Sequence, residues 1–276
     1  MRPKAAAELG VAAGTPVYAG FFDVLSSAYS NGVTDETSVS ATAGTWTIAT
    51  AVHDHIVKSP HPYVWSNYCI PGLYFVHEGS STSAANFTWW RDRLLGQIPY
   101  DECSRMVEDV QQRGHKNEPL FLPYLYGSNY QTGMNGHLCE LQGWHEKKDV
   151  LYAIYEGIVF SHTLNLDKVM KITPAAKTIR MSGGLVNSLP WVKMYASIAG
   201  LPVEISPVRQ PGCQAAAICA AVGAGFWKNF RETLSNCIKP KKMVEPDPQM
   251  HRFLRERYQR FLKINENLAA LVERPA

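Results

Sequence analysis

Three turns marked by glycine carry the residues whose types and spacing could do chemistry, and the first surrounds Asp23. The run Gly20-Phe-Phe-Asp23 lies between a short β-prone segment (14–20) and a predicted helix over 24–31. A carboxylate at such a strand-to-helix turn can serve as a general base toward a substrate hydroxyl. The alternative is that Asp23 only caps the helix by accepting hydrogen bonds from its free N–H groups. The spacing alone leaves both interpretations open.

The second turn is Ala43-Gly44-Thr45-Trp46, which interrupts a β-rich stretch over 38–51. A glycine near the middle of such a stretch predicts a hairpin folded at that point. The hairpin tip would expose backbone N–H groups to an anion, and the Thr45 hydroxyl would add a further donor. The alternative is a plain tight turn that binds nothing.

The third turn joins a predicted strand over 177–182 to a predicted helix over 189–199, and it contains Gly183, Gly184 and Asn187. Paired glycines allow a flat ligand to lie against the backbone, and the asparagine side chain can hydrogen-bond the edge of a base. The alternative is tight packing of the helix against the strand.

Three further groups are explained better by structure than by chemistry. His53, His55 and His61 are close in sequence, but no cysteine or second histidine pair completes a ligand set, so a solvated loop is favoured over a metal site. Cys213 and Cys219 are predicted to be buried in a helix of small residues, where packing explains them. The segments 239–242 and 252–263 are basic and interleaved with aromatic residues, but the second has helical periodicity and contains Glu256, which favours a solvated helix face over nucleic-acid contact.

The elements that must position these turns alternate along the chain. A hairpin followed by alternating strands and helices implies an α/β domain, and a small-residue helix over 213–222 would approach the sheet closely. The segments 53–72 and 127–143 are expected to be loops. The other predicted strands cover 73–77, 120–126 and 202–206, and the other predicted helices cover 86–95, 100–112, 148–170 and 247–274.

Length and composition restrict the class of protein. A chain of 276 residues corresponds to about 1.8 domains at roughly 150 residues each. With 46% apolar and 18% charged residues and a net charge of +3, it is globular and does not bind a polyanion over its whole surface. Six cysteines without a C-x-x-C motif favour a reduced, cytoplasmic compartment. The longest apolar run (215–227) is too short to cross a membrane, which takes about 20 residues.

The order of the blocks adds information that no single turn carries. The series resembles the C-terminal domain of the FGGY carbohydrate kinases over nearly the whole chain. Within that family it is most similar to the branch that contains L-xylulose/3-keto-L-gulonate kinase. The blocks that carry the resemblance are Phe22-Asp23-Val24, Gly44-Thr45-Trp46, His61-Pro-Tyr-Val64, Val76-His-Glu-Gly-Ser80, Ala153-Ile-Tyr-Glu-Gly157, Gly183-Gly184, Ser188-x-x-Trp191 and the helix after Gly212.

The resemblance implies an actin-like ATPase fold of ribonuclease H topology, the C-terminal lobe of a two-lobe kinase that uses ATP and Mg²⁺. Asp23 would take the proton from the sugar hydroxyl that attacks the γ-phosphate. The other roles carried over are phosphate contacts for Gly44 and Thr45, adenosine binding for Gly183, Gly184 and Asn187, and the sugar side for Phe22, Trp46, His77 and Glu78. The substrate would be a sugar such as L-xylulose or 3-keto-L-gulonate, or else a polyol of the erythritol or glycerol type.

The sequence also departs from the family pattern. Ala215 stands where relatives have glycine, and Arg209-Gln210-Pro211 replaces an expected acidic residue. The N-terminal lobe of the relatives is absent from the chain. Residues 1–276 are therefore expected to form one lobe with an insertion over 53–145 and a terminal helix over 247–276, either paired with an N-terminal lobe or forming a homodimer. The alternative is a catalytically silent nucleotide-binding fragment of a truncated gene.

Overall fold

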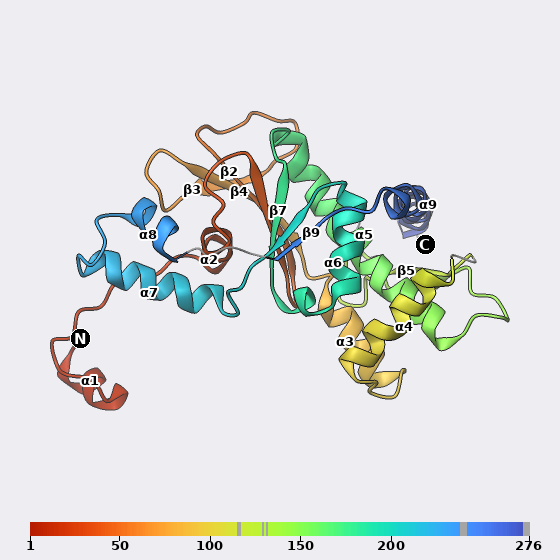
Figure 1. Cartoon of the computed structure of the whole chain (residues 1–276), viewed down its shortest axis with the longest axis horizontal. Coiled ribbons are helices and arrows are strands. Elements are labelled where there is room, and N and C mark those ends of the chain that lie inside the picture. Colours follow the sequence, from red (N-terminus) through yellow and green to blue (C-terminus); the bar gives the residue numbers. More distant parts are fainter. Residues whose placement is uncertain (115–116, 129, 131, 238–241, 273–276) are drawn as a thin grey trace.

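A seven-stranded sheet forms the centre of the molecule, as a computed structural model of residues 1–114, 117–128, 130, 132–237 and 242–272 shows (Figure 1). Its strand order is β3-β4-β2-β1-β7-β8-β9. A separate two-stranded sheet pairs β5 with β6. The strands are β1 (Ser38–Ala43), β2 (Thr47–His53), β3 (Val64–Asn67), β4 (Tyr74–Ser80), β5 (Leu120–Leu122), β6 (His137–Cys139), β7 (Thr178–Ser182), β8 (Val203–Ile205) and β9 (Lys242–Val244).

The direction of each strand follows from the length of its connection. β1 and β2 are joined by a short turn and pair antiparallel, as do β2 with β4 and β3 with β4. β7 and β8 follow helical crossovers and pair parallel with their neighbours β1 and β7, which is the connection that parallel strands need. A meander of three strands followed by two parallel strands on its far side is the ribonuclease H topology, so the predicted actin-like ATPase fold is confirmed.

Helices cover both faces of this sheet (Figure 1). The long helix α5 packs against β2 and β4, with α6 beside it, whereas α2 packs against β1 and β2 on the other face and is itself covered by α7. The helices are α1 (Pro3–Leu9), α2 (Asp23–Ser30), α3 (Ala84–Arg93), α4 (Tyr100–Gln112), α5 (Lys147–Ile172), α6 (Leu189–Ala199), α7 (Pro211–Gly223), α8 (Phe230–Cys237) and α9 (Pro248–Val272), with a 3₁₀ turn over Gly184–Asn187.

The main hydrophobic core surrounds α5, which is buried on almost every side. The apolar spacing of this helix predicted one buried face, but α3, α4, β5 and the sheet all pack against it. Gly157 allows part of this packing, because a Cβ there would overlap the carbonyl oxygen of Phe121 in β5. A smaller core contains residues of α2, such as Tyr29, together with Ile218 of α7.

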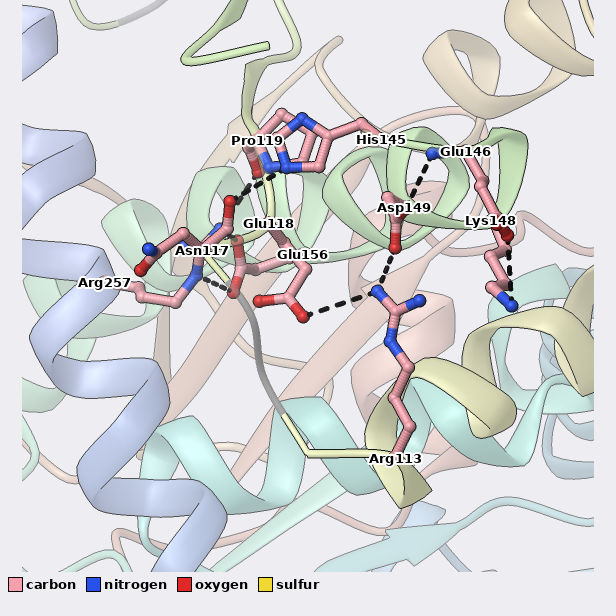
Figure 2. Close-up of polar contacts among 10 residues, drawn as sticks. All are labelled: Arg113, Asn117, Glu118, Pro119, His145, Glu146, Lys148, Asp149, Glu156 and Arg257. Carbon is pink, nitrogen blue, oxygen red and sulfur yellow. Dashed lines mark hydrogen bonds and ion pairs between the residues drawn. The ribbon is translucent and has the colours of Figure 1, made fainter. Parts of the chain in front are cut away.

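A network of buried ion pairs joins the end of α4 and the helix α9 to α5 (Figure 2). The guanidinium of Arg257 donates from Nε to Glu156 Oε1 and from Nη2 to Glu156 Oε2, both at 2.7 Å. Arg257 also donates to the carbonyl of Pro119 at 2.9 Å. Arg113 at the end of α4 pairs with Asp149 in the first turn of α5. Charged groups buried here are paired, as their desolvation requires.

Several expected boundaries differ in the structure. The loops predicted over 53–72 and 127–143 contain the short strands β3 and β6, and the sequence analysis missed α8 and β9. Residues 14–20 form no strand, since they lie mostly exposed without a neighbouring strand to pair with. Of the insertion expected over 53–145, β3 and β4 belong to the central sheet, so only the part from α3 onward lies outside it.

The small-residue helix α7 does not lie against the sheet as expected. It packs on α2, and only three of its residues are buried, namely Ala215, Ile218 and Cys219. Cys213, which was expected to be buried, is exposed. Residues 239–241 of the basic segment lie outside the described residues. Among the helices that the structure describes, none is both long and apolar enough to cross a membrane.

Candidate functional site

A cavity of about 640 Å³ opens between the start of α2 and the tip of the β1–β2 hairpin. It brings together residues that are separated by more than fifty positions in the sequence. Ser27, Thr42, Ile48 and Gly79 complete its wall on α2 and the sheet. The predicted site residues that line it are Phe22, Asp23, Gly44, Thr45, Trp46, His77 and Glu78.

Asp23 is the first residue of α2, and its side chain is exposed to this cavity. Its Oδ1 accepts a hydrogen bond of 2.9 Å from the N–H of Val24. The N-cap residue is Phe22 and not Asp23, but the Asp23 carboxylate still accepts from a free N–H of the first turn while the residue lines the cavity. A carboxylate held at one oxygen in this way keeps its orientation and can still accept a proton.

The hairpin tip is held by hydrogen bonds on both sides of Gly44. Its N–H donates to Trp46 O at 3.0 Å, so it does not point at a ligand as the sequence predicted. Its carbonyl accepts from Ser83 Oγ at 2.7 Å and from the N–H of Ala84 at 3.1 Å. Thr45 stays exposed at the tip and is the residue of this turn that can offer donors to an anion.

A buried histidine of α5 is linked to the hairpin tip through Ser83. His162 in α5 lies with Nε2 at 2.9 Å from Ser83 Oγ, and both residues are buried. Because the Ser83 hydroxyl gives its proton to Gly44 O, His162 must donate from Nε2 to Ser83. Burial lowers the pKa of His162 to about 3. This imidazole is therefore neutral, and a fixed chain of donors runs from α5 to Gly44.

His77 and Glu78 on β4 form the wall opposite Asp23. Nδ1 of His77 is buried and has no hydrogen-bond partner among the described residues, and burial lowers the pKa of this imidazole. Glu78 is held by two nitrogen groups, with Oε1 at 2.8 Å from His61 Nε2 and Oε2 at 3.2 Å from Lys168 Nζ. Both residues therefore contribute polar groups beside the cavity.

A second cavity of about 540 Å³ is lined by residues of α3, α4 and α5, of the turn after β7 and of the start of α6. Gly184 and Asn187 line it, together with the rings of Tyr155 and Trp191, which stack at a centroid distance of 4.1 Å. Asn187 donates from Nδ2 to Gly184 O at 3.0 Å. Ala84 also lines this cavity, and its N–H donates to Gly44 O, so one hydrogen bond joins a residue of each cavity.

Gly183 does not line the second cavity, but it shapes the turn that carries Gly184 and Asn187. Its φ is +104°, which strongly favours glycine, and a Cβ on it would lie 2.5 Å from Ala43 O. The turn after β7 can therefore pass directly beside the end of β1. The tight-packing interpretation of this glycine holds, and the same packing sets Gly184 and Asn187 at the rim of the cavity.

Sequence reasoning missed Ser83 and His162, because their contact depends on α3 and α5 meeting across 79 positions. Gly79 could have been noticed, since a glycine inside a predicted strand signals a close approach. A Cβ on Gly79 would lie 2.9 Å from Thr47 O.

The three histidines predicted to lie in a solvated loop separate in the structure. His53 is fully buried at the end of β2, His55 is exposed, and His61 pairs with Glu78. The loop interpretation is therefore wrong for His53, because β2 continues to that residue and α5 covers it through Thr173.

Comparison with known proteins identifies the family. Residues 39–224 match the model of the C-terminal domain of the FGGY family of carbohydrate kinases. The chain belongs to the FGGY family. The matched segment contains the hairpin tip, Ser83, His162 and the Gly183 turn, whereas Asp23 lies before it.

Individual FGGY relatives cover almost the whole chain. It is 36% identical over 94% of its length to L-xylulose/3-keto-L-gulonate kinase of Escherichia coli K12, of which it covers 51%. It is 34% identical over 98% of its length to a probable L-xylulose kinase of Pasteurella multocida, of which it covers 54%. The chain thus spans about half the length of the curated relatives it matches.

Solved structures show the same FGGY fold at lower identity. A ligand-bound xylulose kinase from Lactobacillus acidophilus superposes with a TM-score of 0.83 at 20% identity, over 98% of this chain and 55% of that one. A xylulose kinase from Rhodospirillum rubrum gives 0.81 at 20% identity, over 99% of this chain and 56% of that one.

Proposed function

We propose that this chain is the ATP-binding half of a carbohydrate kinase that transfers the γ-phosphate of ATP to a hydroxyl of a ketose such as L-xylulose. The relatives at 36% and 34% identity carry names of L-xylulose kinases, which supports this substrate over a polyol. Sugar acids such as 3-keto-L-gulonate belong to the same proposal through the first of these names. The reaction takes place in the cytoplasm, where ATP is available and the free cysteines stay reduced.

The observation that carries the proposal is the hydrogen bond from Ala84 to Gly44 O, which joins a residue of each of the two cavities. Asp23, Thr45, His77 and Glu78 line one, and the glycine turn with Asn187 lines the other. A nucleotide lying across the hairpin tip would have its adenosine on the Asn187 side and its phosphates at Thr45. Its terminal phosphate would then face Asp23 in the first cavity.

The roles of the side chains follow from this placement. Asp23 accepts the proton of the attacking hydroxyl, and Thr45 donates to phosphate oxygens, whose negative charge must be stabilised during transfer. His77 and Glu78 bind other hydroxyls of the sugar, with Phe22 and Trp46 as exposed apolar surfaces beside it. Mg²⁺, when bound with ATP, would neutralise charge on the phosphates near Thr45.

The cavity that holds Asp23 is open, and in the two-lobe relatives a second lobe would close over such a site. We therefore propose that this chain works together with an N-terminal lobe. The experiment compares the 276-residue chain alone with the chain mixed with the separately expressed N-terminal half of the Escherichia coli relative. ADP formation is followed with ATP, Mg²⁺ and L-xylulose, and ATP binding is measured by calorimetry.

We expect the chain to bind ATP, and we expect sugar-dependent ADP formation when both halves are present. ATP binding without turnover in either preparation would overturn the kinase proposal and favour a silent nucleotide-binding module. A chain that neither binds ATP nor turns over would overturn both interpretations.

A further inference from the structure

Four side chains with metal-binding groups gather at the open end of the β1–β2 hairpin, away from its tip. Glu36 precedes β1, His53 ends β2, and Asp54 and His55 form the bend that follows. Oε1 of Glu36 lies 3.0 Å from Nδ1 of His53 and 4.0 Å from Nδ1 of His55. Ligand atoms of Glu36, Asp54 and His55 all lie within 4.8 Å of one another. The FGGY reaction at the hairpin tip does not use this cluster.

The buried member of the cluster is not satisfied by the protein. His53 is 1% exposed, and its Nδ1 faces Glu36 Oε1 without the alignment that a hydrogen bond needs. Its other nitrogen, Nε2, lies 3.1 Å from Thr173 Oγ1 at the end of α5. An imidazole held at one nitrogen by a neighbouring oxygen, with the second nitrogen aimed at a carboxylate, is the arrangement that metal-binding histidines show.

We infer that Glu36, His53, Asp54 and His55 form a binding site for a divalent cation of the Zn²⁺ type. Two imidazoles and two carboxylates favour a first-row transition metal over Mg²⁺ or Ca²⁺, which prefer oxygen ligands alone.

The ligand atoms must move to meet such an ion, because the group within 4.8 Å of one another contains Glu36, Asp54 and His55 but not His53. Tetrahedral bonds of about 2.0–2.1 Å place ligand atoms roughly 3.4 Å apart. The distances of 3.0 and 4.0 Å from Glu36 lie on either side of this value. The contact of 2.6 Å between Asp54 Oδ1 and His55 Nδ1 must open, and both side chains are free to adjust because they are 78% and 64% exposed.

A bound ion would connect three separate parts of the fold. Glu36 belongs to the segment entering β1, His53 and His55 to the segment leaving β2, and Thr173 to the end of α5. The site is therefore structural, and its occupancy should raise the stability of the hairpin base. At saturating metal we expect Tm to rise by several degrees, since a ligand that binds only the folded state stabilises it.

The test is a calorimetric titration of the chelator-treated chain with ZnCl₂, together with Tm measured with and without the metal. We expect saturable binding of one equivalent and affinity at least tenfold lower in His55→Ala and in Glu36→Gln. His137→Ala, which removes a half-buried histidine on β6, is the matched control and should bind like the wild type. Titration with Co²⁺ distinguishes nitrogen and oxygen ligands from the free cysteines, because thiolate ligands give a near-ultraviolet charge-transfer band.

Absence of saturable Zn²⁺ binding would overturn the inference and leave the cluster as two imidazole–carboxylate pairs. Binding that is unchanged in both variants, or a Co²⁺ complex with the thiolate band, would also overturn it. Because both variants alter exposed or half-exposed side chains, they are expected to fold, and circular dichroism of each confirms this before titration.

Discussion

Gly183 lies directly against the Ala43 carbonyl, so that a Cβ on Gly183 would come within 2.5 Å of that oxygen. This contact joins the turn after β7, which carries Gly184 and Asn187 of the second cavity, to the end of β1. The relationship requires a glycine, because φ at this position is also +104°.

Gly183→Ala should therefore destabilise the chain by about 2 kcal/mol or more, through the steric overlap and the unfavourable φ. The measurement is the free energy of unfolding in urea. Gly184→Ala is the matched control, since nothing lies within 4 Å of a Cβ there, and it should change stability by about 0.5 kcal/mol at most. Equal losses in the two variants would contradict the role of the Ala43 contact.

Asp23→Asn should lower kcat by about 10²–10⁴-fold, because the amide cannot accept the proton of the attacking hydroxyl. ATP affinity and Tm should stay close to wild type, since the amide oxygen can still accept from Val24 N–H. The assay is sugar-dependent ADP formation in the preparation that turns over. Asp109→Asn on the exposed side of α4 serves as control. A normal kcat for Asp23→Asn would show that Asp23 is not the base.

Ser83→Ala should loosen the hairpin tip, because it removes the hydroxyl that links His162 to Gly44 O. We expect kcat to fall about tenfold, since one hydrogen bond that positions Gly44 and Thr45 is worth roughly 1–1.5 kcal/mol. The KM for the sugar should change little. Ser81→Ala, two residues earlier, should keep the wild-type kcat. A change in KM alone would show that Ser83 acts on sugar binding and not on the phosphate side.

Stability should fall as the pH is lowered, because His162 cannot accept a proton while it is folded. Its folded pKa is about 3 whereas the unfolded value is about 6.5, so the unfolded chain takes up the proton first. The contribution of neutral His162 to the free energy of unfolding is complete above about pH 6.5 and is lost progressively down to about pH 3. Between pH 6.5 and 5 the loss from this residue is about 2 kcal/mol.

Urea unfolding of the wild type and of His162→Gln over this pH range tests the assignment. Glutamine keeps a donor for Ser83 but does not titrate, so the variant should show the shallower dependence. His53 and His77 also have pKa values lowered by burial and affect both proteins alike. Parallel pH profiles for the two proteins would rule out His162 as the source.

Glu156→Gln should destabilise the chain by about 3–5 kcal/mol, because it leaves the Arg257 guanidinium buried without its carboxylate (Figure 2). The matched control is Glu140→Gln, whose partner Arg260 is 63% exposed, and its effect should be about 1 kcal/mol or less. The two variants are compared by their free energies of unfolding, measured at neutral pH. Similar losses would mean that the buried pair adds no more than the exposed one.

The amino-acid sequence was sufficient to predict those features that depend on residues close together in the chain. The hairpin at Gly44, the helix over 189–199 and the strand before Gly183 follow from local turn signals and periodicity, and the structure has them within a residue or two. The order of these blocks also carried the resemblance to the FGGY family and hence the expected fold, and the family match confirms it.

Tertiary structure alone decided which groups meet and how they are used. His162 and Ser83 reach Gly44 only because α3 and α5 pack together, and the Gly44 N–H is taken up by Trp46 O inside the turn. His53 is buried only because α5 ends over β2. Local propensities act over a few residues, whereas burial and hydrogen bonding depend on segments far apart in the chain. The candidate residues could therefore be predicted from the sequence, but their contacts depend on how the chain folds.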